Sequence, residues 1–175
     1  VSPLAWNPQQ EIISGLNTKY NYKSFLNRVN CLANALKNIG VKKGNTIGVM
    51  DWDCHRYLEC FFAIPMMGAI LHTINIRLSE QQILYTINHA EDDILLVHQD
   101  FIPIIKKIHS QFNRTIKIVL INDSSMEIKD IVFQNYVSNY EELLKKNESS
   151  FEFEDFDEDT IATKFYTTGT TGKPK

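Results

Sequence analysis

Apolar and polar positions follow two different periods along this chain. Between residues 25 and 39 the apolar positions recur every three or four residues, which predicts a helix with one buried face. Asn21 can cap the start of this helix, and Gly40 follows as its stop. Elsewhere the apolar residues form short continuous runs, which are typical of strands buried on both faces. The pattern therefore predicts buried strands separated by amphipathic helices.

The other elements follow from the same two patterns. Strands are predicted at residues 46–50, 69–74, 94–97, 116–121 and 161–166, and helices at residues 55–67, 80–89, 100–108 and 139–146. Asp51 and Asp53 are expected to cap the first of these helices. Ser79 forms a capping-box pattern for the second, and Ser138 is expected to cap the last.

The alternation of strands and helices determines the expected fold class. Because the strands are apolar throughout rather than half polar, they predict an α/β fold with a mostly parallel sheet flanked by helices on both faces. A small hairpin is expected before this sheet. In it, residues 11–14 pair with residues 18–20 across a turn that begins at Gly15.

Size and charge narrow the possible partners. With 175 residues, the chain is long enough to bury the core of one globular domain. Its 18 basic and 21 acidic residues give a net charge of -3, so neither a nucleic-acid groove nor a polybasic membrane anchor is expected. The longest apolar run, residues 60–71, is shorter than the ~20 residues that cross a bilayer. No transmembrane segment is therefore predicted.

The cysteines favour a reducing compartment. Cys31, Cys54 and Cys60 are an odd number and contain no Cys-x-x-Cys pair. This usage is typical of reduced thiols, so a cytoplasmic location is expected. The cluster around Cys54 and His55 contains metal-ligand types, but its spacing matches no zinc signature and no metal site is predicted. A homo-oligomer is left open.

An acidic run lies near the carboxyl end of the chain. Residues 148–159 hold seven of the acidic residues and no basic one. A run of this kind is typical of a solvated segment. We therefore interpret residues 148–159 as an acidic linker within one unit that spans residues 1–175.

The last ten residues, 166–175, read YTTGTTGKPK and follow the last predicted strand. Glycines let a backbone approach phosphate oxygens closely, threonines supply hydroxyl donors, and lysines bring positive charge. A Walker A loop is excluded, because Thr167 and Pro174 stand where that motif needs a glycine and a hydroxyl residue. The segment predicts a polyphosphate site, and the alternative is a polar surface turn.

This decapeptide resembles the signature of the adenylate-forming enzymes, the superfamily of acyl-CoA synthetases, firefly luciferase and peptide-synthetase adenylation domains. Residues 51–59 and 66–78 resemble the fatty-acyl-CoA synthetase branch, in particular its medium- and long-chain members. The resemblance implies that residues 1–175 are the amino-terminal part of the large domain of such an enzyme. On this interpretation, the segment is not expected to catalyse a reaction by itself.

The function that the resemblance implies is that of an acid–thiol ligase. A fatty acid would react with ATP to give an acyl-adenylate, and coenzyme A would then displace AMP, while magnesium and positioned donors neutralise the departing pyrophosphate. Lys175 is implied as the catalytic residue, and Lys173 is the weaker candidate of the two lysines. The implied phosphate-binding residues are Thr167, Thr168, Gly169, Thr170, Thr171, Gly172, Lys173 and Lys175.

Several alternatives stay open at this point. The protein could be an aryl- or short-chain-acid ligase, or a non-catalytic nucleotide-binding module. Asp51 and Asp53 could form a carboxylate pair instead of helix caps, since both follow a predicted strand. His72 could serve only in the core or at its rim, and Asn75 could simply turn the chain. Alternatively, both could line the nucleotide pocket or bear on the acyl site.

Overall fold

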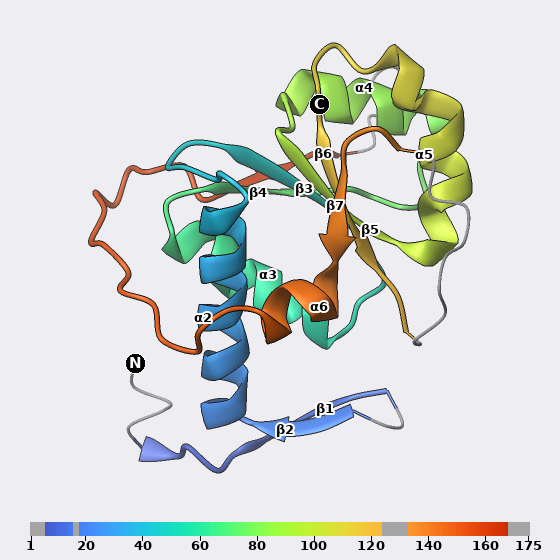
Figure 1. Cartoon of the computed structure of the whole chain (residues 1–175). Helices are drawn as coiled ribbons and strands as arrows, with labels where there is room; N and C mark the ends of the chain where they lie inside the picture. Colours follow the sequence, from blue (N-terminus) through green and yellow to red (C-terminus); the bar gives the residue numbers. More distant parts are fainter. Residues whose placement is uncertain (1–5, 16–17, 124–132, 168–175) are drawn as a thin grey trace.

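A computed structural model describes residues 6–15, 18–123 and 133–167 of the chain, and a sheet lies at its centre (Figure 1). The sheet has six strands in the order β7-β6-β5-β3-β4-β8, and every neighbouring pair runs parallel. The strands are β3 (Thr46–Met50), β4 (Ile70–Thr73), β5 (Ile94–His98), β6 (Lys117–Ile121), β7 (Tyr136–Asn139) and β8 (Thr163–Phe165). The predicted α/β fold with a parallel sheet is confirmed.

Helices cover both faces of this sheet, as predicted. They are α2 (Tyr22–Asn38), α3 (His55–Met66), α4 (Glu80–Ala90), α5 (Ile102–Ile108) and α6 (Tyr140–Lys145), with single 3-10 turns at Gln99–Phe101 and His109–Gln111. Helices α2, α3 and α6 lie on one face, and α4 and α5 lie on the other (Figure 1). The predicted hairpin is also present, as antiparallel strands β1 (Glu11–Ser14) and β2 (Thr18–Asn21) at the start of α2.

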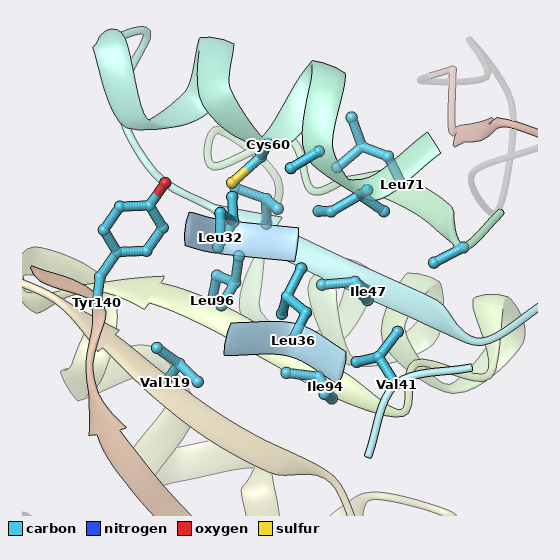
Figure 2. Close-up of a cluster of buried hydrophobic side chains, with 14 of the residues drawn as sticks. Leu32, Leu36, Val41, Ile47, Cys60, Leu71, Ile94, Leu96, Val119 and Tyr140 are labelled. Atoms are coloured by element: carbon cyan, nitrogen blue, oxygen red, sulfur yellow. The ribbon is translucent and has the colours of Figure 1, made fainter. Parts of the chain in front are cut away.

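The strands supply both hydrophobic clusters, because successive side chains of a strand point to opposite faces. In β5, Ile94 and Leu96 belong to the cluster under α2 and α3, whereas Leu95 belongs to the cluster under α4 and α5. Figure 2 shows the first cluster, in which Leu32 and Leu36 of α2 lie over the sheet. Complete burial of one such leucine contributes about 1.5–3 kcal/mol, so these clusters dominate the stability of the fold.

Two of the predicted helix caps are confirmed. The Asn21 side chain accepts a hydrogen bond of 2.9 Å from the backbone N–H of Ser24 at the start of α2. Ser79 and Gln82 form the complete capping box at the start of α4. These bonds satisfy N–H groups that lack a partner within the first turn of a helix.

The predicted caps of the other two helices are wrong. The N-cap of α3 is Cys54, which makes no side-chain cap bond, so neither Asp51 nor Asp53 caps this helix. The N-cap of α6 is Asn139 rather than Ser138, and its side chain accepts from the N–H of Glu141 at 3.0 Å. Asn139 directly precedes α6, and asparagine is as favourable an N-cap as serine.

The acidic linker is attached to α2 through its backbone. Asn30 and Asn34 lie one turn apart on α2, and their side-chain amides donate to the carbonyl groups of residues 148–150 at 2.7–2.9 Å. The ring of Phe153 is partly buried against the core, while all seven acidic side chains of residues 148–159 are exposed. The acidic side is therefore solvated, and the opposite side holds the segment against α2.

The remaining sequence expectations concern thiols and membranes. Cys31, Cys54 and Cys60 are all free thiols. Burial raises the pKa of the Cys60 thiol well above its usual value, so this thiol stays protonated and unreactive at neutral pH. Among the described residues, none of the helices combines the length and the apolar character that crossing a bilayer requires.

Candidate functional site

The strand order changes direction at β3. The chain passes from β3 to β4 on one side, and then to β5 on the other side of β3. In open parallel sheets, ligands bind outside the carboxyl ends of the strands near such a reversal. A crevice of about 380 Å³ lies there, lined by residues 51–53, Tyr57, residues 73–77 and Tyr166. We call it the carboxyl-edge crevice.

The predicted phosphate motif begins in the lining of this crevice. Tyr166 is the first residue of the motif and directly follows β8. Thr167 is described and exposed. The other residues predicted to bind phosphate, Thr168, Gly169, Thr170, Thr171, Gly172, Lys173 and Lys175, lie outside the described residues. Their role, including that of Lys175 in catalysis, stays a prediction.

Asp51 and Asp53 do not form a pair of equivalent carboxylates. Asp51 is buried, and its Oδ1 accepts from the backbone N–H of Trp52 at 2.7 Å. Its Oδ2 accepts from the Cys54 thiol at 3.1 Å. Asp53, in contrast, is exposed to solvent. Asp51 therefore holds the loop that follows β3, and this bonding explains why it does not reach the first turn of α3.

A second polar cluster joins the first turn of α3 to the carboxyl ends of β5 and β6. Arg56 contacts Asp123 with its guanidinium at 2.5 Å, and His98 lies 3.2 Å from the other oxygen of the same carboxylate. Arg56 lowers the pKa of Asp123, and the hydrogen bond from His98 acts in the same direction. Sequence reasoning missed this cluster because its members are far apart in the chain.

His72 is buried on β4, next to the edge strand β8, on the face of the sheet that α4 covers. Its Nδ1 lies 3.0 and 2.8 Å from the two carboxylate oxygens of Asp92, and both side chains are completely buried. Burial raises the pKa of Asp92, while the hydrogen bond from His72 and the charge of Lys164 oppose this shift. Gly48 makes room for the pair, because a Cβ there would lie 2.7 Å from Asp92 Oδ2.

Tyr166 connects this buried pair to the crevice. The rings of His72 and Tyr166 meet edge to face with their centroids 5.1 Å apart. The Tyr166 hydroxyl lies 2.8 Å from Nδ1 of His89, which is on α4. Burial raises the pKa of Tyr166 to about 12, so its hydroxyl stays protonated and can donate to His89. Sequence reasoning singled out His72 without assigning it this contact.

The turn after β4 forms another part of the crevice. The Asn75 side chain accepts a hydrogen bond of 3.0 Å from the backbone N–H of Arg77, so Asn75 turns the chain, which was one of the two roles considered for it. Arg77 brings a positive charge to the lining of the crevice, which also contains Asp51 and Asp53.

Within the described ranges, no three His, Cys, Asp or Glu side chains are arranged to hold a metal ion.

Comparisons with known proteins identify CoA ligases as relatives of this chain. The chain is 33% identical to a 3-methylmercaptopropionyl-CoA ligase of Ruegeria lacuscaerulensis, over 97% of this chain and 32% of that protein. It is 32% identical to a long-chain-fatty-acid–CoA ligase of Thermus thermophilus, over 95% of this chain and 30% of that protein. The chain thus spans about a third of the length of these curated relatives.

A solved structure shares the fold. The crystal structure of an anthranilate CoA ligase in complex with anthranoyl-AMP superimposes with a TM-score of 0.88 at 24% identity, over 99% of this chain and 32% of that one. The family described as AMP-binding enzyme matches residues 5–175, which is nearly the whole chain. By this match, the chain belongs to the AMP-binding enzyme family.

Proposed function

We propose that the protein of which residues 1–175 are a part activates a fatty acid with ATP and transfers the acyl group to coenzyme A. The observation that carries this proposal is the decapeptide at residues 166–175, which has the signature of adenylate-forming enzymes and follows the carboxyl end of β8. The carboxyl-edge crevice lies beside its first residue, Tyr166.

The proposed reaction has two steps. A carboxylate oxygen of the acid forms a bond to the α-phosphorus of ATP, and the bond from that phosphorus to the bridging oxygen breaks, so pyrophosphate leaves. The thiolate sulfur of coenzyme A then bonds to the acyl carbon, and AMP leaves. The first step brings one anion to another, and therefore needs positive charge and hydrogen-bond donors around the departing pyrophosphate.

In this proposal the motif supplies those groups. Its hydroxyl and backbone N–H donors bind the phosphates, together with the magnesium ion that accompanies ATP. Lys175 would neutralise charge on pyrophosphate as the bond to the α-phosphorus breaks. Lys173 is the less important of the two lysines.

We also propose a cytoplasmic location for the protein. The three cysteines are free thiols, which is typical of a reducing compartment, and the cytoplasm supplies ATP and coenzyme A.

The proposed acid has a medium or long alkyl chain. Two relatives are named a medium-chain- and a long-chain-fatty-acid–CoA ligase, and each is at least 32% identical over at least 93% of this chain. An alkyl chain gains ~0.8 kcal/mol per buried methylene, which favours long acids wherever an apolar tunnel receives them. An aryl acid is the alternative, because one protein with the same fold is an anthranilate CoA ligase.

Acid-dependent exchange between ATP and labelled pyrophosphate tests the proposal. The full-length protein is assayed with octanoate, palmitate, benzoate and acetate, and without any acid. We expect exchange that requires an acid and is fastest with the two alkyl acids of eight carbons or more. Fast exchange with benzoate alone would favour the aryl-acid alternative. ATP hydrolysis without any acid, and no exchange with any of the four, would contradict the ligase assignment.

A further inference from the structure

Tyr166 is held from two sides at the point where the chain leaves the sheet. The His72 and Tyr166 rings meet edge to face within the sheet, and Nδ1 of His89 on α4 lies 2.8 Å from the Tyr166 hydroxyl. Residue 167 and the rest of the phosphate motif follow directly. Because Tyr166 is itself the first residue of the motif, a shift of Tyr166 moves the start of the motif.

The register of the sheet explains why His72 lies under Tyr166. Gly48 of β3, His72 of β4 and Lys164 of β8 are direct partners across the three strands, so they share one face. Tyr166 is two residues after Lys164 and is therefore on the same side of the chain as His72. The His72 ring thus lies between a glycine that leaves space for Asp92 and the strand that carries Tyr166.

The His72–Asp92 pair gives this contact a fixed geometry. Both oxygens of Asp92 lie within 3.0 Å of Nδ1 of His72, so a carboxylate there holds the hydrogen on Nδ1 and limits rotation of the ring. Nε2 of His72 is buried without a hydrogen-bond partner. Such an atom costs free energy. The pair with Asp92 accounts for Nδ1 of His72, and the contact with Tyr166 is the further interaction that the histidine ring makes here.

We propose that Tyr166 anchors the start of the phosphate motif, and that His72 and His89 are positioning residues that act on ATP chemistry through Tyr166. This inference rests on the proposed function. His72 supports the ring of Tyr166, and His89 fixes the direction of its hydroxyl. Together they define where the donors of the motif begin, before ATP binds.

A double-mutant cycle in the full-length protein tests the bond between Tyr166 and His89. Tyr166→Phe removes the hydroxyl only, and His89→Leu removes the ring nitrogen that receives it, at an exposed position, without supplying another acceptor. We expect each variant to lower kcat of acid-dependent exchange about fivefold, the size of one neutral hydrogen bond. The double variant should lose no more than either single variant, because both remove the same bond.

The acid KM and the stability separate positioning from a general structural role. We expect the acid KM to change by less than about twofold and the thermal midpoint to stay near that of the wild type. Tyr136→Phe and His109→Leu are matched controls, because Tyr136 lies on the far edge strand and Nδ1 of His109 lies 2.8 Å from the carbonyl oxygen of Lys106. Equal losses in the controls, or fully additive losses in the double variant, would overturn the role of His89.

Two further variants test His72. His72→Gln keeps a donor for Asp92 but removes the ring under Tyr166, so kcat should fall about tenfold. Wild-type kcat in this variant would overturn the role of His72. If His72→Gln does not fold, His72→Phe combined with Asp92→Leu restores a ring without leaving a buried carboxylate unpaired. A folded protein with wild-type kcat then supports the ring contact, and a tenfold loss contradicts it.

Binding of ATP distinguishes failure of this inference from failure of the proposed function. Tyr166→Leu removes the whole anchor, and calorimetry without any acid should show about tenfold weaker ATP binding, because the first residue of the motif is no longer held by His72 and His89. If the wild type shows no acid-dependent exchange but Tyr166→Leu still weakens ATP binding, the anchor stands and the ligase proposal fails. Unchanged ATP binding and unchanged kcat in Tyr166→Leu would overturn the anchor.

Discussion

A buried ion-pair network joins α2, α3 and α6, and replacing Arg28 tests how much it contributes. The Glu59 side chain is completely buried and accepts from Arg28 Nε at 2.6 Å and from the Tyr140 hydroxyl at 2.7 Å. The same guanidinium makes two hydrogen bonds to Glu141, at 3.0 and 2.8 Å. Arg28→Met keeps most of the apolar stem and removes the bonds of the guanidinium to Glu59 and Glu141.

The expected cost follows from what the variant leaves behind. Glu59 would stay buried with Tyr140 as its remaining donor, and breaking one side of a buried pair costs about 3–5 kcal/mol. We therefore expect Arg28→Met to lower the free energy of unfolding by about that amount at pH 8. An exposed pair should behave differently. Lys19→Met breaks the contact between Lys19 and Glu11, whose side chains are 59% and 53% exposed, respectively. This loss should cost less than about 1 kcal/mol of the free energy of unfolding.

The pH dependence of this cost has a definite sign. Burial raises the pKa of Glu59 in the folded protein, and Arg28 opposes that shift. In Arg28→Met the opposition is lost and the pKa rises further, so the folded variant takes up a proton more readily than the unfolded chain. When folding raises the pKa of a carboxyl group, the folded protein loses stability as pH rises through the pKa of that group in the folded state. The deficit of the variant should therefore be smaller at pH 5 than at pH 8.

Urea unfolding followed by circular dichroism measures this at both pH values, with Lys19→Met as the control. The free energy of unfolding in water is compared for the wild type, Arg28→Met and the control. The comparison is valid where all three show the same dependence of the free energy on urea concentration. If Arg28→Met costs no more than Lys19→Met, the network does not hold the three helices together. If the deficit of Arg28→Met grows at pH 5, the explanation through Glu59 is wrong.

Three other predictions concern the sheet, the motif and the substrate. Gly48→Ala should lower stability by about 1–3 kcal/mol in a thermal melt, because its Cβ would lie 2.6 Å from Leu95 Cδ2 and 2.7 Å from Asp92 Oδ2. An unchanged midpoint would contradict this close packing. Lys175→Ala should lower turnover of the full-length protein by about 10² while Lys173→Ala has little effect, and equal losses would refute the distinction. Octanoate should outcompete acetate and benzoate in the ligase assay, because each buried methylene adds ~0.8 kcal/mol to the binding free energy of the acid. The reverse order would exclude the fatty-acid assignment.

Most of the fold was predictable because the strands and helices differ in period. The run at 46–50 matches β3 at both ends, and the apolar spacing after Asn21 matches the length of α2. Strand β7 was missed. It is an edge strand of four residues, Tyr136–Asn139, with exposed and half-buried positions, so it lacks the apolar run that identifies the buried strands.

The candidate site was predictable only in part, because its parts are joined by the parallel sheet rather than by the sequence. The motif that begins at Tyr166 could be identified from residue types alone. The contact between His72 and Asp92 could not, since the two residues come together only through the pairing of β3 with its neighbours and the space at Gly48. A histidine within an apolar strand was the available signal, and it does not identify a partner.

Isotope transfer from the acid to AMP tests the central claim most directly. The full-length protein is given octanoate labelled with ¹⁸O in both carboxylate oxygens, together with ATP and coenzyme A, and the products are analysed by mass spectrometry. If the carboxylate attacks the α-phosphorus, one labelled oxygen links the acyl carbon to that phosphorus. This oxygen stays on the phosphorus when the sulfur of coenzyme A bonds to the acyl carbon and the carbon–oxygen bond breaks. The account therefore predicts AMP carrying one ¹⁸O, with octanoyl-CoA and unlabelled pyrophosphate. Unlabelled AMP, or label recovered in inorganic phosphate with ADP as the nucleotide product, would contradict it.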